Sequence, residues 1–234
     1  ALLSSYSLER SPVGAQVVKR ANQSRVDYGP LNACFRDKQA ADPVAAGLAQ
    51  LADPGAEGVA RREALAQALQ LKNHEFNAQG VEMNQRCVSA AVIPDTSVGE
   101  EVWQRDPELY LQATTRPGAK IPHAWLIDAQ GHRISTLDRV GKGRTTLVTG
   151  IAGQAWVEAV KQLNMSYLDA LVIGATGAQD VYSDWRAVRE IDEAGALLVR
   201  PDGVVAWRSM RGVKDVDTAR KQLAEVIDSV MALP

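Results

Sequence analysis

Cysteine and histidine are scarce in this sequence, which limits the chemistry that its side chains can perform. Only Cys34 and Cys87 occur, far apart along the chain, and such a pair fits neither a disulfide framework nor a zinc site. His74, His123 and His132 show no His-x-x-His or His-Glu-x-x-His spacing. We predict two reduced structural thiols and no metal ligand, with His123 as the one partly buried histidine and the other two as polar surface residues.

Charge of one sign and long apolar runs are also missing. The formal net charge is −2 with both signs interspersed, so the chain offers no basic face and no nucleic acid partner is expected. No apolar run approaches the roughly 18 residues of a membrane span. The opening ALLSSYSLERS has neither the basic nor the apolar region of a secretory signal. We therefore expect a chain without membrane segments, located in the cytoplasm.

Enzyme motifs are equally rare. No Gly-x-Ser-x-Gly sequence marks a hydrolase nucleophile. The first residue is Ala1, not methionine, and Leu2–Tyr6 reads as the middle of an amphipathic helix. We predict that the chain is a fragment of a longer protein. Its 234 residues, 46% of them hydrophobic, are enough for one good core, or for one core and a smaller attached segment.

The pattern divides at about residue 115, which predicts two domains, 1–115 and 116–234. The first part is mainly helical, and apolar residues recur at helical spacing between start and stop signals. Three helices are predicted, from Ser11-Pro12 to Gly29-Pro30, from Asp42-Pro43 to Asp53, and from about Ala56 to Leu71. Residues 76–93 read as a loop followed by an extended strand that ends at Pro94.

After residue 115, short strands alternate with helices. Strands are predicted at Ala124–Ile127, Ile134–Leu137, Thr146–Thr149, Leu168–Ile173, Ala196–Arg200 and Val204–Arg208, and helices at Gly153–Leu163, Tyr182–Ile191 and Val216–Met231. The last helix has a cap at Asp215 or Asp217. This order is that of a thioredoxin-like domain, so the predicted fold class is α/β: a cysteine-free, thioredoxin-like C-terminal domain preceded by a mainly helical segment.

Two segments imitate functional motifs without the residues that the chemistry needs. Thiol exchange requires a reactive cysteine at the start of the first helix, but Thr149–Trp156 contains none. The turn in Leu171–Asp180, LVIGATGAQD, follows a strand as a dinucleotide site would. It has only Gly174 and Gly177, and the Asp180 carboxylate would repel phosphate. A strand-ending turn in which Asp180 or Ser183 caps the next helix is the better interpretation.

The segment Gly195–Arg208, GALLVRPDGVVAWR, predicts a β-hairpin. Pro201 fixes φ for the turn, Asp202 can accept hydrogen bonds from nearby backbone, and Gly203 accepts a positive φ. Its sequence resembles the closing hairpin of the flavin-dependent aromatic-ring hydroxylases, in the branch that acts on phenol and 2,4-dichlorophenol. Three further segments resemble that family in the same order: Ser5–Val13, Asn73–Arg86 and Pro117–Leu126.

The resemblance implies a monooxygenase that uses NADPH to reduce FAD, activates O2 and hydroxylates a phenol or chlorophenol ortho to its hydroxyl group. In such enzymes the cofactor performs the oxygen chemistry and the protein positions the phenol. The Gly-x-Gly-x-x-Gly, Asp-Gly and Gly-Asp motifs that hold FAD have no counterpart here. We therefore predict no catalytic, cofactor-binding or metal-binding residue in this chain, which would be inactive without its N-terminal FAD domain.

The resemblance also implies that the C-terminal domain stabilises the enzyme and contributes to a homo-oligomer. The five tryptophans, in a chain with two phenylalanines, are expected mostly in the core, with an interface as the alternative. Glu9 and Arg10 are candidates for an ion pair between domains or for an ordinary solvated pair. A stand-alone, non-catalytic thioredoxin-like interaction module is the alternative function.

Overall fold

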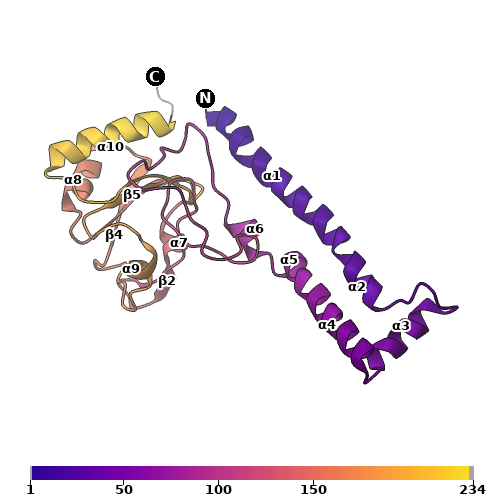
Figure 1. The fold of residues 1–234 in the computed structure, drawn as a ribbon. Helices are drawn as coiled ribbons and strands as arrows, with labels where there is room; N and C mark the ends of the chain where they lie inside the picture. Colours follow the sequence, from indigo (N-terminus) through magenta and orange to yellow (C-terminus); the bar gives the residue numbers. More distant parts are fainter. Residues whose placement is uncertain (1, 232–234) are drawn as a thin grey trace. The chain divides into compact units, whose positions relative to one another are not determined.

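The computed structural model describes residues 2–231, which form two compact units (Figure 1). The first unit contains the chain up to Ser11, Met83–Trp103 and everything from Gln112 onward, and the second contains Pro12–Glu82 and Gln104–Leu111. Each unit thus combines segments that are distant in sequence. The division predicted at residue 115 is a single cut in the chain, and it stays a prediction. Ala1, on which the expectation of a fragment partly rests, lies outside the described residues.

The N-terminal part of the chain is helical, as predicted. Its helices are α1 (Leu2–Val26), α2 (Tyr28–Cys34), α3 (Pro43–Ala52), α4 (Ala56–Leu71), α5 (Asn73–Phe76) and α6 (Gln79–Met83). The predictions for α3 and α4 are confirmed. Asp42 caps α3, because its Oδ1 accepts hydrogen bonds from the backbone N–H groups of Val44 and Ala45 at 3.1 and 3.0 Å.

Two proline signals were misread. Pro12 was expected to begin the first helix but lies inside α1. Proline has no backbone N–H, so α1 lacks one helical hydrogen bond at that position. Gly29-Pro30 was expected to end the helix but lies in the first turn of α2. Backbone N–H groups in a first turn have no helical partner, so proline costs no hydrogen bond there.

The strand predicted before Pro94 is wrong. Residues 84–93 contain no strand or helix. Single backbone hydrogen bonds connect them to the rest of the first unit, from Cys87 N–H to the Gly118 carbonyl and from Ile93 N–H to the Ala206 carbonyl, both at 2.8 Å. The segment is extended enough to make these bonds, but it has no neighbouring strand over consecutive residues, so no ladder forms.

The predicted alternation of strands and helices after residue 115 is confirmed. The elements are β1 (Trp125–Ile127), β2 (Arg133–Ser135), α7 (Thr136–Arg139), β3 (Thr145–Gly150), α8 (Gln154–Leu163), β4 (Leu168–Ile173), α9 (Asp184–Val188), β5 (Ala196–Val199), β6 (Val205–Ser209) and α10 (Val216–Met231). Strands β1 and β2 form a two-stranded sheet, and the main sheet has the order β4-β3-β5-β6. The β3–β4 pair is parallel, while β3–β5 and β5–β6 are antiparallel. The fold is therefore α/β; the thioredoxin-like name stays a prediction from this topology.

Element ends differ from the predictions where local hydrogen bonds decide them. The strand expected to reach Leu137 ends at Ser135, because Ser135 and Asp138 form a capping box that begins α7. The helix expected at Tyr182–Ile191 is only α9, and it is flanked by Ser183 and Glu190, both with positive φ. For α10 the predicted bounds are confirmed, and Asp215 is the cap that accepts from the Thr218 N–H at 2.8 Å.

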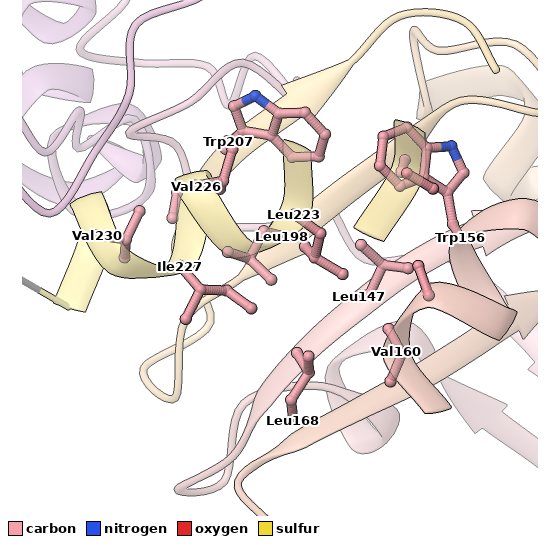
Figure 2. Close-up of a cluster of buried hydrophobic side chains, with 14 residues drawn as sticks. Leu147, Trp156, Val160, Leu168, Leu198, Trp207, Leu223, Val226, Ile227 and Val230 are labelled. Carbon is pink, nitrogen blue, oxygen red and sulfur yellow. The ribbon is translucent and has the colours of Figure 1, made fainter. Parts of the chain in front are cut away.

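The main sheet is covered on both faces. Leu147 and Leu198 point to the face covered by α8 and α10, together with Trp156 and Leu223 (Figure 2). Their neighbours Val148 and Leu197 belong to the cluster on the other face, together with Trp185 of α9. Because successive side chains of a strand point to opposite faces, a strand buried on both sides reads as a continuous apolar run, as β5 does with ALLV. Strand β3, TTLVTG, is buried along its whole length as well, but three of its six residues are threonines.

The tryptophans divide between core and surface. Trp156, Trp185 and Trp207 are buried, as expected, and the rings of Trp156 and Trp207 pack edge to face with centroids 5.6 Å apart. Trp103 and Trp125 are each 37% exposed. Among residues 2–231, none of the helices combines the length and the apolar character that crossing a membrane requires.

Gly118 gives a direct test of how the first unit is packed. Its φ is +93°, and a Cβ there would lie 2.4 Å from the Cys87 carbonyl oxygen. We expect Gly118→Ala to lower the free energy of unfolding by about 3 kcal/mol, because strain and overlap add. Gly131 has a similar φ of +84° but open space around it, so Gly131→Ala should cost only about 1 kcal/mol. Urea denaturation of both variants measures this, and equal losses would contradict it.

Candidate functional site: two arginine clusters on the hairpin

The hairpin forms as its turn residues predict. Gly203 has a φ of +83°, and two backbone hydrogen bonds close the turn, from the Arg200 N–H to the Val204 carbonyl at 2.8 Å and from the Gly203 N–H to the Arg200 carbonyl at 2.9 Å. The Asp202 carboxylate accepts from the Val204 N–H at 3.2 Å. Strands β5 and β6 therefore hold Arg200 at the turn and Arg208 near the other end of β6 in fixed positions.

Arg200 forms the first cluster with Glu9 of α1. Its guanidinium donates to both carboxylate oxygens of Glu9, at 2.6 and 2.9 Å, and also pairs with Asp202 at 2.5 Å. Ser89 donates to Glu9 as well, at 2.6 Å. A buried carboxylate that accepts two parallel bonds from arginine is held in one geometry. The start of α1 is therefore fixed to the hairpin, within the first unit.

The charges of this cluster are strongly stabilised. Hydrogen bonds from Arg200 lower the pKa of Glu9 from 4.5 to about 2, although burial opposes the shift. Burial would lower the pKa of Arg200, but its bonds to Glu9 and Asp202 outweigh that and raise it. Burial and the charge of Glu9 raise the pKa of the Cys87 thiol to about 11, so this thiol is protonated and unreactive at neutral pH.

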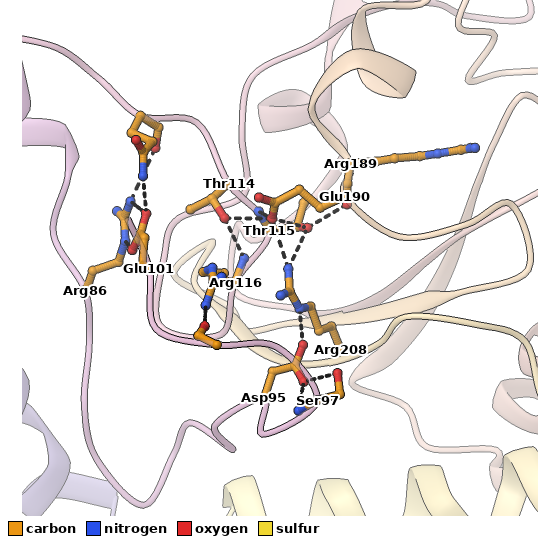
Figure 3. A network of polar contacts seen from close by, with 12 residues as sticks. Arg86, Asp95, Ser97, Glu101, Thr114, Thr115, Arg116, Arg189, Glu190 and Arg208 are labelled. Carbon is orange, nitrogen blue, oxygen red and sulfur yellow. Dashed lines mark hydrogen bonds and ion pairs between the residues drawn. The ribbon is translucent and has the colours of Figure 1, made fainter. Parts of the chain in front are cut away.

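Arg208 forms the second cluster, with Asp95 and Glu190 (Figure 3). Its side chain is 2% exposed, and it donates to Asp95 at 2.6 Å and to Glu190 at 2.9 Å. The same Glu190 oxygen accepts from the Thr114 hydroxyl at 2.7 Å and the Thr115 N–H at 2.8 Å. One arginine thus connects β6 to the turn before β5 and to two upstream segments.

Both carboxylates of the second cluster are held ionised. Burial alone would raise the pKa of Asp95 and Glu190, but hydrogen bonds and the charge of Arg208 outweigh it, so both values lie below their ordinary range. Sequence reasoning missed this cluster. The available signal was a charged residue, Arg208, at the end of an apolar strand, because arginine is rarely buried without a partner.

The two clusters position segments of the chain and offer no reactive group. Each carboxylate already accepts bonds from arginine and from neighbouring donors. Within residues 2–231, no group of three or more histidine, cysteine or acidic side chains could hold a metal ion. We interpret the clusters as the anchors that attach the upstream segments to the C-terminal domain.

The histidines partly contradict the sequence analysis. His123 was expected to be partly buried but is exposed. Side chains alternate between the two sides of an extended chain, and here Ala124 and Leu126 take the buried side. His74 is the half-buried one, with Nε2 3.0 Å from Asp106 Oδ2. His132 is exposed in its turn, as predicted.

The other predicted residues lie as follows. Cys34 and Cys87 are not bonded to each other, as predicted. Asp180 caps α9 by accepting from the N–H groups of Trp185 and Arg186 at 3.2 and 3.0 Å, so the interpretation of LVIGATGAQD as a helix-capping turn is confirmed. Glu9 and Arg10 do not pair with each other: Glu9 pairs with Arg200, whereas Arg10 donates to Gln85 at 2.8 Å.

Removal of the Glu9 charge should weaken the first cluster measurably. We expect Glu9→Gln to lower the free energy of unfolding by about 1–3 kcal/mol at pH 7. The folded pKa of about 2 lies below the ordinary 4.5, so this contribution is present above pH 4.5 and is lost as pH falls toward 2. Urea titrations of the unchanged chain and of Glu9→Gln between pH 7 and 3.5 measure their free energies of unfolding. The difference between the two values should shrink below pH 4.5.

A matched control for that variant is Glu158→Gln, which removes an exposed pair with Lys161. Its cost should stay below about 0.5 kcal/mol. A Glu9→Gln protein as stable as this control at pH 7 would show that the Glu9–Arg200 pair anchors nothing.

Arg208 should matter more, because it serves two carboxylates. Arg208→Met leaves Asp95 and Glu190 without their cation, and we expect a loss of about 3 kcal/mol at pH 7. Acid should reduce this loss, since protonation neutralises the two orphaned carboxylates. Arg211→Met, at an exposed position just beyond β6, should change stability little. Urea denaturation at pH 7 and pH 5 compares the three proteins, and a loss that grows with acid would refute the pairing.

Comparisons with known proteins place this chain in a family. Residues 114–234 match the family model "Aromatic-ring hydroxylase, C-terminal". The chain is 44% identical to the 2,4-dichlorophenol 6-monooxygenase of Delftia acidovorans over 90% of its own length, and 42% identical to a phenol 2-monooxygenase of Pseudomonas sp. over 93%. It spans 36% and 37% of those relatives, respectively.

A solved structure gives the same assignment. The flavin-dependent monooxygenase PieE, determined with FAD and substrate, is 41% identical and superposes on 100% of this chain with a TM-score of 0.86, while the chain covers 40% of PieE. Both the helical part and the hairpin domain are included in that superposition. The chain belongs to the aromatic-ring hydroxylase family, and its residues 114–234 match the model of that family's C-terminal domain.

Proposed function

We propose that this chain is the C-terminal part of an FAD- and NADPH-dependent monooxygenase that converts phenols or chlorophenols to catechols by ortho-hydroxylation, in the degradation of aromatic compounds. One observation carries the proposal. The identity to 2,4-dichlorophenol 6-monooxygenase extends over 90% of the chain, well beyond the C-terminal domain that residues 114–234 match. The helical part is therefore similar in sequence to the same relatives as the hairpin domain.

The described residues do not fit FAD. A dinucleotide pyrophosphate needs backbone N–H groups at a glycine-rich helix start. At the turn after β4, the corresponding N–H groups of Trp185 and Arg186 are already bonded to the Asp180 carboxylate, which would also repel phosphate. We therefore assign no flavin ligand to this chain and derive no catalytic step from it. FAD, NADPH and the phenol would bind to the part of the relatives that this chain does not span.

In this proposal the chain acts by positioning. The Arg200 cluster fixes the start of α1, and the Arg208 cluster fixes the segments around Asp95 and Thr114, all on one hairpin. Segments that precede the C-terminal domain in sequence are thereby held by it. The proposal includes a cytoplasmic location, where NADPH is available, and a homo-oligomer, both of which follow from the family resemblance.

The alternative is a stand-alone thioredoxin-like interaction module. It is favoured by the first unit, whose sheet is covered on both faces by the chain's own side chains. The helices of the second unit favour the monooxygenase fragment instead. They expose many large apolar side chains, a surface that another part of a longer protein would cover. These residues include Val17, Val18, Val44, Leu48, Val59, Leu69 and Phe76.

Purification of the chain and of a longer protein that includes the upstream coding sequence distinguishes the two. The chain alone should show no flavin absorbance band and no NADPH oxidation, and it should aggregate on size-exclusion chromatography. The longer protein should retain FAD and oxidise NADPH in response to phenol or 2,4-dichlorophenol. Stoichiometric FAD on the chain alone would contradict the absence of flavin ligands, and a well-behaved monomer would favour the module.

A further inference from the structure

A second feature of the first unit is a cavity of about 290 Å3 beside the Arg200 cluster. We call it the α10 cavity, because the C-terminal half of that helix forms one wall; Figure 2 shows Ile227 and Val230 together at that end of the helix. The remaining walls come from the sheet, the hairpin turn, Ser5 of α1 and the segment at Ala91. The lining includes Ala91, Tyr167, Arg200, Asp202 and Met231.

The size of the cavity limits its occupant. A cavity of about 150 Å3 lined by apolar side chains is large enough to bind benzene, and drug-sized ligands occupy pockets that begin at about 300 Å3. The α10 cavity lies between these limits. It therefore has room for one substituted ring and is too small for a nucleotide or a flavin.

The walls favour an aromatic ring that carries a hydroxyl group. Leu198, Ile227, Val230 and Met231 make the lining mostly apolar, and the tyrosine ring and the methionine sulfur both pack favourably against aromatic rings. The Tyr167 hydroxyl donates a hydrogen bond to the Met165 sulfur at 3.2 Å. Sulfur is a weak acceptor, so a ligand oxygen can replace it.

The charges beside the cavity exclude an anion. Glu9 and Asp202 both pair with Arg200, so this group of three carries a net charge of −1. The pKa of Glu9, about 2, keeps that carboxylate ionised at neutral pH. An added carboxylate or phenolate would meet a cation that is already fully engaged, next to an excess of negative charge. A neutral ligand meets no such barrier.

We propose that the α10 cavity binds a neutral phenol with a single ring, at a site separate from any flavin site. This inference rests on the cavity and does not depend on the proposed function. Because the walls come from α1, the sheet, the hairpin turn and α10, a bound phenol would link the start of α1 to the C-terminal domain. Binding would stabilise the folded chain, and the stabilisation would grow with the logarithm of the phenol concentration once that exceeds the Kd.

The test is a titration with phenol of the longer protein that includes the upstream coding sequence, because the 234-residue chain alone is expected to aggregate. Binding is followed by 1H–13C NMR of the methionine methyl groups, among which Met231 lines the cavity, and by thermal unfolding. We expect saturable shifts at residues that line the cavity, together with a higher unfolding temperature. Benzoate has the same ring and a negative charge, and it should cause neither effect at the same concentrations. Equal shifts with phenol and benzoate, or phenol shifts that spread over the surface without saturation, would overturn the proposal.

Two variants locate the site. Ala91→Leu fills the cavity and should weaken phenol binding by about tenfold or more, since the new side chain takes the volume of the ring. Its control is Ala187→Leu, the same change at an exposed position of α9, which should bind phenol normally. Undiminished binding by a folded Ala91→Leu protein would place the phenol elsewhere and overturn the proposal.

Asp202→Asn keeps the turn and removes one negative charge, so it tests the site even where Ala91→Leu fails to fold. It should raise the affinity for benzoate relative to that for phenol, and an unchanged ratio would count against the charge argument. Deletion of residues 232–234 tests whether the chain itself occupies the cavity. Phenol binding that is seen only after this deletion would overturn the proposal.

Discussion

The first unit depends on two arginines of one hairpin being buried next to carboxylates from distant parts of the chain. A buried guanidinium is tolerable only when it is paired and fully hydrogen-bonded. Arg200 therefore requires Glu9 of α1, and Arg208 requires Asp95 and Glu190. Because these partners cannot be exchanged for water without cost, the segments that carry them are held on the hairpin even where they form no regular secondary structure.

This arrangement explains how irregular chain can be well defined. Residues 84–124 contain neither helix nor strand in the structure, yet they include Asp95, Thr114 and Gly118, each with specific partners on β6 or beside it. In a β-sheet, backbone hydrogen bonds at regular intervals hold a strand in place. In residues 84–124 a few charge-assisted hydrogen bonds hold the segment instead, and each of these is directional and stronger than a neutral hydrogen bond.

Much of the fold was predictable because its signals are local. The Pro-Asp-Gly turn, the cap at Asp42 and the helical repeat of α10 depend only on neighbouring residues, and each is present as expected. Pro12 and Gly29-Pro30 were misread because proline marks a helix start or stop only weakly: α1 continues through Pro12, and Pro30 fits in the first turn of α2. The Arg208 cluster was out of reach, because its partners lie 113 and 18 positions away in the sequence. The family could be predicted because the sequence of the hairpin resembles that of its members. Catalytic residues could not be predicted, because the motifs that hold FAD have no counterpart in this chain.

The pairing of Glu9 with Arg200 joins residues 191 positions apart, and this sets an order for folding during synthesis. Helix α1 leaves the ribosome well before the hairpin, and its Glu9 carboxylate has no Arg200 to pair with until the hairpin follows. The start of α1 can therefore dock only after the hairpin has been made. A contact of such long range closes late. Strands β5 and β6 therefore complete the position of a helix that was synthesised long before them.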